Sequence, residues 1–247
     1  QLESRVMGRI VKSRFPKSFC YHDGSLGVYD ITEVCTQVCD NIADLSDNLI
    51  LLYRIVKKAL KPDEHIVATG YVAERVLGTH VNLGAGSAEE ACYLMNAFRQ
   101  HLPELVSLSL NSGRIYYEGV CAEFPDVLDL SMLNYVKQFT KKLSSGLSDP
   151  IMLSPKSTVE IRCFDSQQAP EQDVALAAYT FAIHQYAREH FPHYPLDRPF
   201  LKAMYGQASR VGVEAVVNGN QVRDWIKETL DTVQPEPAYF KPLLGKI

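Results

Sequence analysis

Two segments of the chain, 78–83 and 157–162, alternate apolar and polar residues with the two-residue period of a half-buried β-strand. One face of each predicted strand is apolar and carries Val81, Leu83, Val159 and Ile161. The other face carries His80, Asn82, Glu160 and Arg162. A strand face that only meets water more often shows Thr, Lys and Ser. An imidazole, an amide, a carboxylate and a guanidinium together therefore predict chemistry on phosphate, with metal ligands and a guanidinium to hold it.

The remaining hydrophobic pattern predicts helices separated by a few strands. Segment 41–60 has a helical apolar stripe and ends in a basic turn before Pro62, and Ser87 with Glu90 makes a capping box. We expect helices at 41–60, 87–101, 103–109, 131–143, 171–190, 200–211 and 221–233. We expect strands at 26–35, 65–69, 77–83 and 158–164, and an irregular tail from Pro235. This order predicts an α+β fold, and without repeats or a clear linker we expect one domain over 1–247.

Composition narrows the class of protein. Of the 247 residues, 46% are hydrophobic and 22% charged, as in an ordinary globular protein, and the net charge of -4 argues against a nucleic-acid binder. No apolar run is long enough to span a bilayer, since even 49–56 is interrupted by Arg54. The six cysteines are scattered through apolar segments. We therefore predict a cytoplasmic protein with buried thiols and no membrane partner.

Each polar residue of the two strands also has a purely structural explanation. A lone His on a strand is usually a hydrogen-bonded structural residue, and Glu160 with Arg162 could be a cross-strand pair that contributes about 0.2–1 kcal/mol. We favour function because the apolar neighbours of Glu160 indicate a central strand. Segment 84–87 leads into a helix N-terminus that could bind an anion, but a tight turn with an N-cap explains it at least as well. The sequence has no P-loop and no Gly-x-Ser-x-Gly elbow.

Five segments in order resemble the motifs of one known family. They are 31–36 (ITEVCT), 78–82 (GTHVN), 102–112 (LPELVSLSLNS), 157–162 (STVEIR) followed by Asp165, and 208–215 (ASRVGVEA). In that order they resemble the carboxylate–amine ligases of the glutamate–cysteine ligase type, within the glutamine synthetase-like superfamily. The likeness covers most of the chain, from about residue 23 to residue 215.

The resemblance implies both a fold and a chemistry. It implies a curved, mostly antiparallel sheet around the active site, backed by helices. It also implies ATP-dependent activation of a carboxylate as an acyl phosphate, with Mg²⁺ or Mn²⁺, followed by attack of an amine. By position, Glu33, His80 and Glu160 would be metal ligands, Arg162 would hold phosphate, and Arg210 would be a further candidate for phosphate or a substrate carboxylate. Asn82 would lie in the nucleotide site.

The sequence departs from the family pattern in two places. Asn82 stands where the family has a second His, and an Asn carbonyl is a weaker ligand for Mg²⁺ than a charged group. The family's first strand, Gly-x-Glu-x-Glu, is not found, although Gln1-Leu2-Glu3 could be its trailing end. If it is that end, Glu3 is a fourth candidate metal ligand and the residues upstream are lacking from this sequence; if it is not, the metal site lacks ligands and we expect no activity.

We therefore predict an ATP- and Mg²⁺-dependent carboxylate–amine ligase that acts on a small-molecule acid and an amine, with glutamate as the acid by resemblance. The family tendency to assemble also predicts a homo-oligomer. Two alternatives stay open. One is a degenerate family member that binds nucleotide or a partner protein without catalysis. The other is an unrelated α+β protein, which a large separation between His80 and Glu160 would support.

Overall fold

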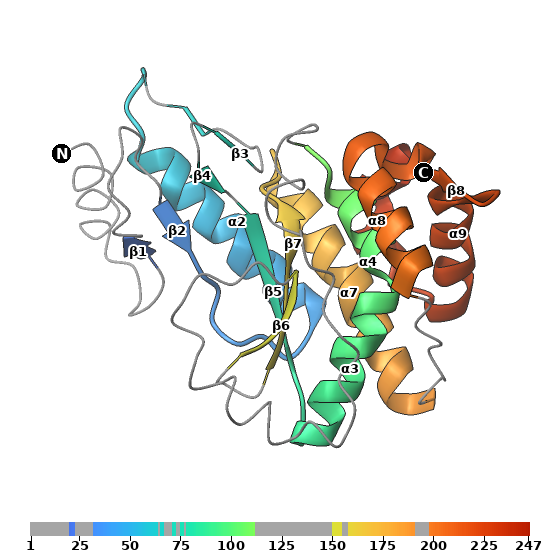
Figure 1. Ribbon diagram of the computed structural model, residues 1–247. Coiled ribbons are helices and arrows are strands. Elements are labelled where there is room, and N and C mark those ends of the chain that lie inside the picture. Colours follow the sequence, from blue (N-terminus) through green and yellow to red (C-terminus); the bar gives the residue numbers. More distant parts are fainter. Residues whose placement is uncertain are drawn as a thin grey trace. The chain divides into compact units, whose positions relative to one another are not determined.

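The computed structural model describes residues 20–22, 32–63, 65–66, 71–72, 75–76, 78–111, 150–154, 158–190 and 198–247 (Figure 1). The chain divides into two compact units. The first contains the chain up to Val67 together with Gln168–Val174, and the second contains Ala68–Gln167 and Ala175–Ile247. The single domain over 1–247 stays a prediction.

A three-stranded antiparallel sheet lies in the second unit. Its order is β5 (Gly78–Gly84), β7 (Thr158–Asp165) and β6 (Ile151–Ser154), so β7 is the central strand, as its apolar neighbours predicted. Val159 and Ile161 are fully buried, while Thr158, Glu160 and Arg162, which alternate with them, are only partly buried. β6 was not predicted, because an apolar run of three residues without alternation is too short to indicate a strand by itself.

Helices cover the apolar face of this sheet. α3 (Ala88–Gln100) and α4 (Leu102–Ser109) pack against the sheet, and α4 also contacts α8 (Arg198–Val211) and α9 (Val222–Val233) (Figure 1). Every residue of α4 is buried. α7 (Pro170–His190) contributes Leu176, Tyr179 and Ile183 to the same core. The predicted helices here are confirmed to within two residues at each end.

The prediction of an irregular C-terminal tail was wrong. After η3 (Gly212–Glu214) and a short hairpin of β8 (Val216–Val217) and β9 (Asn220–Gln221), the chain ends in α10 (Pro237–Phe240) and η4 (Lys241–Lys246). Pro237 starts α10, where its missing N–H costs nothing. Phe240 and Leu243 are buried in the core, and Lys246 Nζ donates to the Leu108 carbonyl at 2.7 Å. Burial of these two side chains explains why a proline-rich segment folds back.

The first unit contains a short antiparallel pair and one long helix. β1 (Cys20–His22) pairs with β2 (Thr32–Val34), and α2 (Ile42–Ala59) follows. Asn41 caps α2, because its side-chain oxygen accepts from the amide of Asp44 at 2.9 Å. Tyr53 of α2 donates to the Gln168 carbonyl at 3.2 Å, which ties the helix to the other segment of this unit.

Several expectations can be compared only in part. The predicted helix at 131–143 and most of the strand at 26–35 lie outside the described residues, whereas β2 confirms the end of that strand. His65 and Ile66 are not in a strand, and the rest of 65–69 is outside the described residues. A third pair, β3 (Tyr71–Val72) with β4 (Arg75–Val76), is also antiparallel. Helices with small antiparallel sheets confirm the α+β class; the curvature of the sheet stays a prediction.

Two further expectations concern cysteines and membranes. Cys92 and Cys163 are free thiols that are almost fully buried, as predicted, whereas Cys35 and Cys39 are only half-buried. Within the part of the chain that the structure describes, no helix is long and apolar enough to cross a bilayer.

A buried polar cluster joins α4 to α7 and α9. Glu104 is fully buried, its Oε1 lies 2.8 Å from His101 Nδ1, and its Oε2 accepts from the Tyr179 hydroxyl. Burial raises the pKa of Tyr179 well above its usual value, the charge of Glu104 and the hydrogen bond to it raise the pKa further, and a hydrogen bond with Thr229 opposes them. Tyr179 therefore stays a neutral donor to the carboxylate.

We expect Tyr179→Phe to lower the free energy of unfolding by about 1–3 kcal/mol, because a buried carboxylate oxygen loses its donor. The phenylalanine ring keeps the stacking on Phe240, at 5.5 Å between ring centroids. The change in the free energy of unfolding therefore measures the contribution of the hydroxyl group alone. Urea unfolding followed by circular dichroism measures it. Tyr239→Phe, on the half-buried Tyr239 of α10, is the matched control. Equal unfolding free energies for the two variants would contradict this role of Tyr179.

Candidate functional site

The polar faces of β5 and β7 meet because the two strands are antiparallel neighbours. Asn82 lies directly opposite Glu160 in the register, and the alternation predicted from sequence holds along both strands. The side chains of His80, Glu160 and Arg162 are 39%, 20% and 31% exposed, respectively. They are accessible from solvent, yet each rests partly on the sheet.

Glu160 is the centre of this face. Its Oε1 lies 3.1 Å from His80 Nδ1 and 3.6 Å from Arg162 Nε. The same carboxylate oxygen therefore lies next to an imidazole and a guanidinium. The proximity of His80 and Glu160 also removes the observation that would have supported an unrelated protein with coincidental strands.

An irregularity in the pairing positions His80. Thr79 pairs with Phe164 and Val81 with Ile161, so β7 has one extra residue between these pairs. Next to it, Gly78 pairs with Asp165, and a Cβ at Gly78 would lie 2.9 Å from the Phe164 carbonyl oxygen. The glycine of the predicted Gly-x-His motif is therefore required by close approach of the two backbones.

Asp165, the last residue of the predicted motif, has a structural role. It is fully buried, and its Oδ2 accepts from the Asn111 amide at 2.6 Å. Gln167 donates to the Ser109 carbonyl at 2.8 Å, so the end of β7 is bound to the end of α4. These two hydrogen bonds anchor the end of β7, the strand that carries Glu160 and Arg162.

The structure brings together two of the four predicted metal ligands. Among the described residues, no group of three or more His, Cys, Asp or Glu could hold a metal ion. Glu33 lies on β2, where its backbone pairs with Tyr21, in the first unit. Glu3 lies outside the described residues. His80 and Glu160 thus offer two ligands, and the roles of Glu33 and Glu3 stay predictions.

The other predicted site residues are Arg210 and Asn82. Arg210 lies in the last turn of α8 and is exposed. Asn82 is exposed on β5, and its Oδ1 accepts from the hydroxyl of Thr158 on β7 at 3.1 Å. Thr158 was not singled out from the sequence, although it precedes Val159 in the same alternating segment and shares the face of Glu160.

Segment 84–87 has the capping arrangement rather than an open anion site. Ser87 Oγ accepts from the Glu90 amide at 3.1 Å, and Glu90 Oε2 accepts from the Gly86 amide. Arg188 pairs with the same carboxylate. Burial would raise the pKa of Glu90, but the Gly86 amide and Arg188 outweigh it and lower the pKa. The chain's own carboxylate therefore takes the place that an external anion would need.

His184 supports the end of β5 from α7. The ring is 5% exposed, its Nε2–H donates to the Gly84 carbonyl at 2.8 Å, and its Nδ1 is buried with no hydrogen-bond partner among the described residues. Burial lowers the pKa of His184 below the usual 6.5; Arg188 also lowers it, while the Gly84 bond and Glu90 oppose this. A second proton on the ring would sit on Nδ1, which has no hydrogen-bond acceptor among the described residues.

We expect the wild-type protein to lose stability as the pH falls below 6.5, because the unfolded chain then binds a proton that folded His184 does not. The stability contributed by neutral His184 is fully present above pH 6.5 and is lost as the pH falls through its lowered pKa. His184→Gln keeps a donor for the Gly84 carbonyl and removes the titration. Thermal midpoints at several pH values between 5 and 8 should show a smaller acid loss in this variant. Parallel curves for the two proteins would contradict the assignment.

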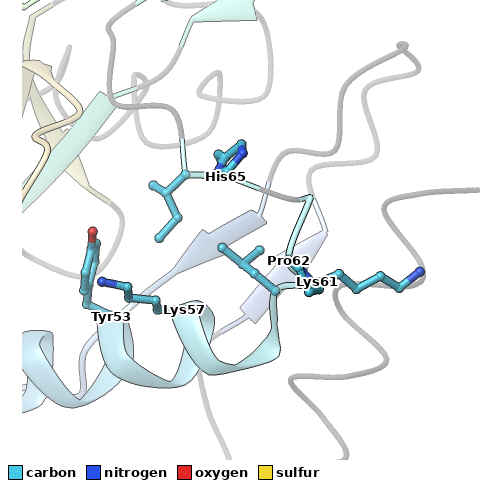
Figure 2. Close-up of a pocket in the computed structure, with 7 residues that line it drawn as sticks. Tyr53, Lys57, Lys61, Pro62 and His65 are labelled. Atoms are coloured by element: carbon cyan, nitrogen blue, oxygen red, sulfur yellow. The ribbon is translucent and has the colours of Figure 1, made fainter.

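A pocket of about 460 Å³ lies in the first unit, at the end of α2 (Figure 2). It is lined by Tyr53, Lys57, Leu60, Lys61, Pro62, His65 and Ile66. Basic residues in the last turn of a helix interact favourably with the negative C-terminal end of the helix dipole. This interaction explains the position of Lys57 without any bound ligand. We assign this pocket no role in the chemistry of the β5–β7 face.

Several curated proteins with similar sequences carry the same name. A protein named "Putative glutamate–cysteine ligase 2" from Herminiimonas arsenicoxydans is 28% identical over 198 residues, which cover 67% of this chain and 53% of the relative. The protein of the same name from Dechloromonas aromatica (strain RCB) is 28% identical over 188 residues, covering 65% and 49%. This chain thus spans about half the length of the curated relatives that it matches. No family model matches the chain.

A solved structure gives an independent likeness in fold. The Pup ligase PafA of the prokaryotic ubiquitin-like modification pathway, solved in complex with ADP, aligns with a TM-score of 0.51 at 15% identity, over 98% of this chain and 61% of PafA. At that identity the likeness concerns the fold alone. The sequence relatives confirm the resemblance to carboxylate–amine ligases of the glutamate–cysteine ligase type that the five motifs predicted.

Proposed function

We propose that this protein is an ATP- and Mg²⁺-dependent carboxylate–amine ligase of the glutamate–cysteine ligase type. The observation that carries the proposal is the position of Glu160 between His80 and Arg162 on one accessible sheet face. The names of the sequence relatives support the reaction class, and the ADP complex of PafA supports a nucleotide as a ligand of this fold.

The reaction has two steps. The carboxylate of the acid attacks the γ-phosphate of ATP, so that an acyl phosphate forms and ADP leaves. The amine nitrogen then attacks the acyl carbon and loses a proton, and inorganic phosphate leaves as the amide forms. Both steps concentrate negative charge on phosphoryl oxygens, and catalysis therefore depends on positioning and on nearby positive charge.

The residues of the β5–β7 face suit these needs. His80 and Glu160 would hold a divalent ion, which when bound supplies the charge that neutralises the phosphate oxygens and the attacking carboxylate. Arg162 presents a planar fork of N–H donors that matches a phosphoryl group. By the family resemblance, Glu33 and Glu3 stay proposed metal ligands, and Arg210 would contact phosphate or a substrate carboxylate.

The wider picture of the protein follows from the same family. We infer a curved glutamine synthetase-like sheet, a cytoplasmic location, a homo-oligomer, and small-molecule substrates with glutamate as the acid. The alternative is a degenerate member that binds nucleotide without ligation. Asn82 in place of the family's second His favours that alternative, whereas the Glu160–Arg162 pair favours an active enzyme.

Phosphate release from ATP tests the proposal directly. The purified protein is incubated with ATP and Mg²⁺ and with carboxylates and amines supplied in pairs. We expect release that requires both members of a pair, which would also identify the substrates. If MgADP binds but no pair gives release, the degenerate binding module is correct. If neither occurs, the proposed function is wrong.

A further inference from the structure

Asn82 has two neighbours on the polar face of the central strand β7. It pairs directly with Glu160, and two residues further along β5 Gly84 pairs with Thr158, so Glu160 lies opposite Asn82 and Thr158 lies diagonal to it. Both atoms of the amide must be matched to these surroundings. The carbonyl oxygen can only accept a hydrogen bond, and the NH₂ group can only donate.

The contacts fix which way the amide points. Thr158 Oγ1 lies 3.1 Å from Asn82 Oδ1 and donates to it. The carbonyl oxygen is therefore engaged by the hydroxyl, and the NH₂ group is the part of the amide that can donate to a ligand at this face.

We propose that Thr158 is a positioning residue whose hydroxyl orients Asn82, so that Asn82 presents N–H donors to an anionic oxygen bound at this face and does not act as a carbonyl ligand of a metal ion. The inference rests on the proposed function for its ligand, since phosphate and carboxylate oxygens both accept from an amide. It assigns a role to Thr158 and excludes one for Asn82. The sequence alone had left both a metal ligand and a nucleotide contact open for Asn82.

Three single variants separate the two roles of Asn82. Thr158→Val keeps the β-branched shape and removes the hydroxyl, whereas Thr158→Ser restores the hydroxyl. Asn82→Asp replaces the donors by a carboxylate. A metal ligand would bind Mg²⁺ more tightly as Asp, but a donor to an anion would become repulsive. The sign of the Asn82→Asp effect therefore discriminates the roles.

Calorimetric titration with MgADP gives the first readout. We expect Thr158→Val to weaken binding about 2–10-fold, the range for one lost hydrogen bond, and Thr158→Ser to stay within about twofold of wild type. Asn82→Asp should weaken binding further. In an Asn82→Ala background, Thr158→Val should have no effect, because the hydroxyl would have nothing to orient. Tighter MgADP binding by Asn82→Asp, or an undiminished Thr158→Val effect in the Asn82→Ala background, would overturn the proposal. Titrating glutamate separately shows whether the anion is a carboxylate instead.

A second readout needs no ligand. In protein labelled with ¹⁵N-asparagine, the side-chain amide pair that disappears in Asn82→Asp belongs to Asn82. We expect Thr158→Val to shift this pair and Thr158→Ser to leave it near its wild-type position. An unshifted pair in Thr158→Val overturns the positioning role alone. Absence of MgADP and glutamate binding in the wild-type protein would overturn the donor role together with the proposed function, even with the expected shifts.

Discussion

Replacing Glu160 with Gln is expected to reduce Mg²⁺-dependent ATP turnover on the order of 10³-fold, with folding intact. Charge stabilisation by a bound divalent ion contributes several kcal/mol to such a reaction, and an amide cannot replace the charge of the ligating carboxylate. Glutamine keeps the size of the side chain, and its carbonyl oxygen can still accept from His80. The loss should therefore appear in turnover and in Mg²⁺ dependence, not in the thermal midpoint.

Glu228→Gln is the matched control for this experiment, because Glu228 is an exposed carboxylate on α9. Both variants are measured with the acid–amine pair that gives phosphate release in the wild-type protein, over a series of Mg²⁺ concentrations. Turnover of Glu160→Gln equal to that of Glu228→Gln would remove Glu160 from the metal site. If Glu160→Gln lowers the thermal midpoint so far that the protein is largely unfolded under the assay conditions, the loss of turnover would assign Glu160 a structural role instead.

The sequence predicted this face well because its signal is local. A two-residue period shows directly that His80, Asn82, Glu160 and Arg162 lie away from the apolar residues, and the apolar neighbours of Glu160 predicted that β7 is central, which the structure confirms. Their mutual contacts depend on the pairing of β5 with β7, which lie about 80 residues apart. The family resemblance implied a shared metal site for His80 and Glu160, whereas the pairing of the two strands is a finding of the structure.

The hydrophobic pattern of the sequence could not predict hydrogen bonds of polar side chains with residues far away in the chain. Glu104 reads as an ordinary first-turn acidic residue of a short helix, where it would favour the helix dipole. In the structure it is buried against Tyr179, 75 positions away. Likewise, nothing local shows that His184 reaches the carbonyl of Gly84. Such contacts are set by the packing of α4 and α7, which no single segment encodes.

The prediction for the C-terminal tail was wrong for a related reason. Its prolines lower helix propensity and its apolar residues follow no helical or strand period, so local rules indicate an irregular segment. Two of these residues, Phe240 and Leu243, nevertheless fit the core. Tertiary packing then stabilises short helical turns that would not form alone.

Arg162→Lys is expected to lower kcat on the order of 10²-fold, although the net charge of the site is unchanged. The guanidinium is planar and offers paired donors to a phosphoryl group, while the ammonium is a compact point charge that can satisfy one oxygen at a time. Arg162 Nε also lies 3.6 Å from Glu160 Oε1, so the same side chain can bridge the proposed metal ligand and the transferring group. A loss that is larger in kcat than in the KM for ATP would indicate that the fork acts mainly in the transition state.

Arg54→Lys, on the exposed surface of α2, is the matched control and should leave kcat unchanged. Steady-state phosphate release with the identified acid–amine pair measures both variants. Nearly equal kinetics for Arg162→Lys and Arg54→Lys would show that positive charge alone suffices at this position, and Arg162 would then be a partner of Glu160 only. A large loss would instead separate the active ligase from the degenerate binding module, because a module that only binds nucleotide has no transition state for the fork to stabilise.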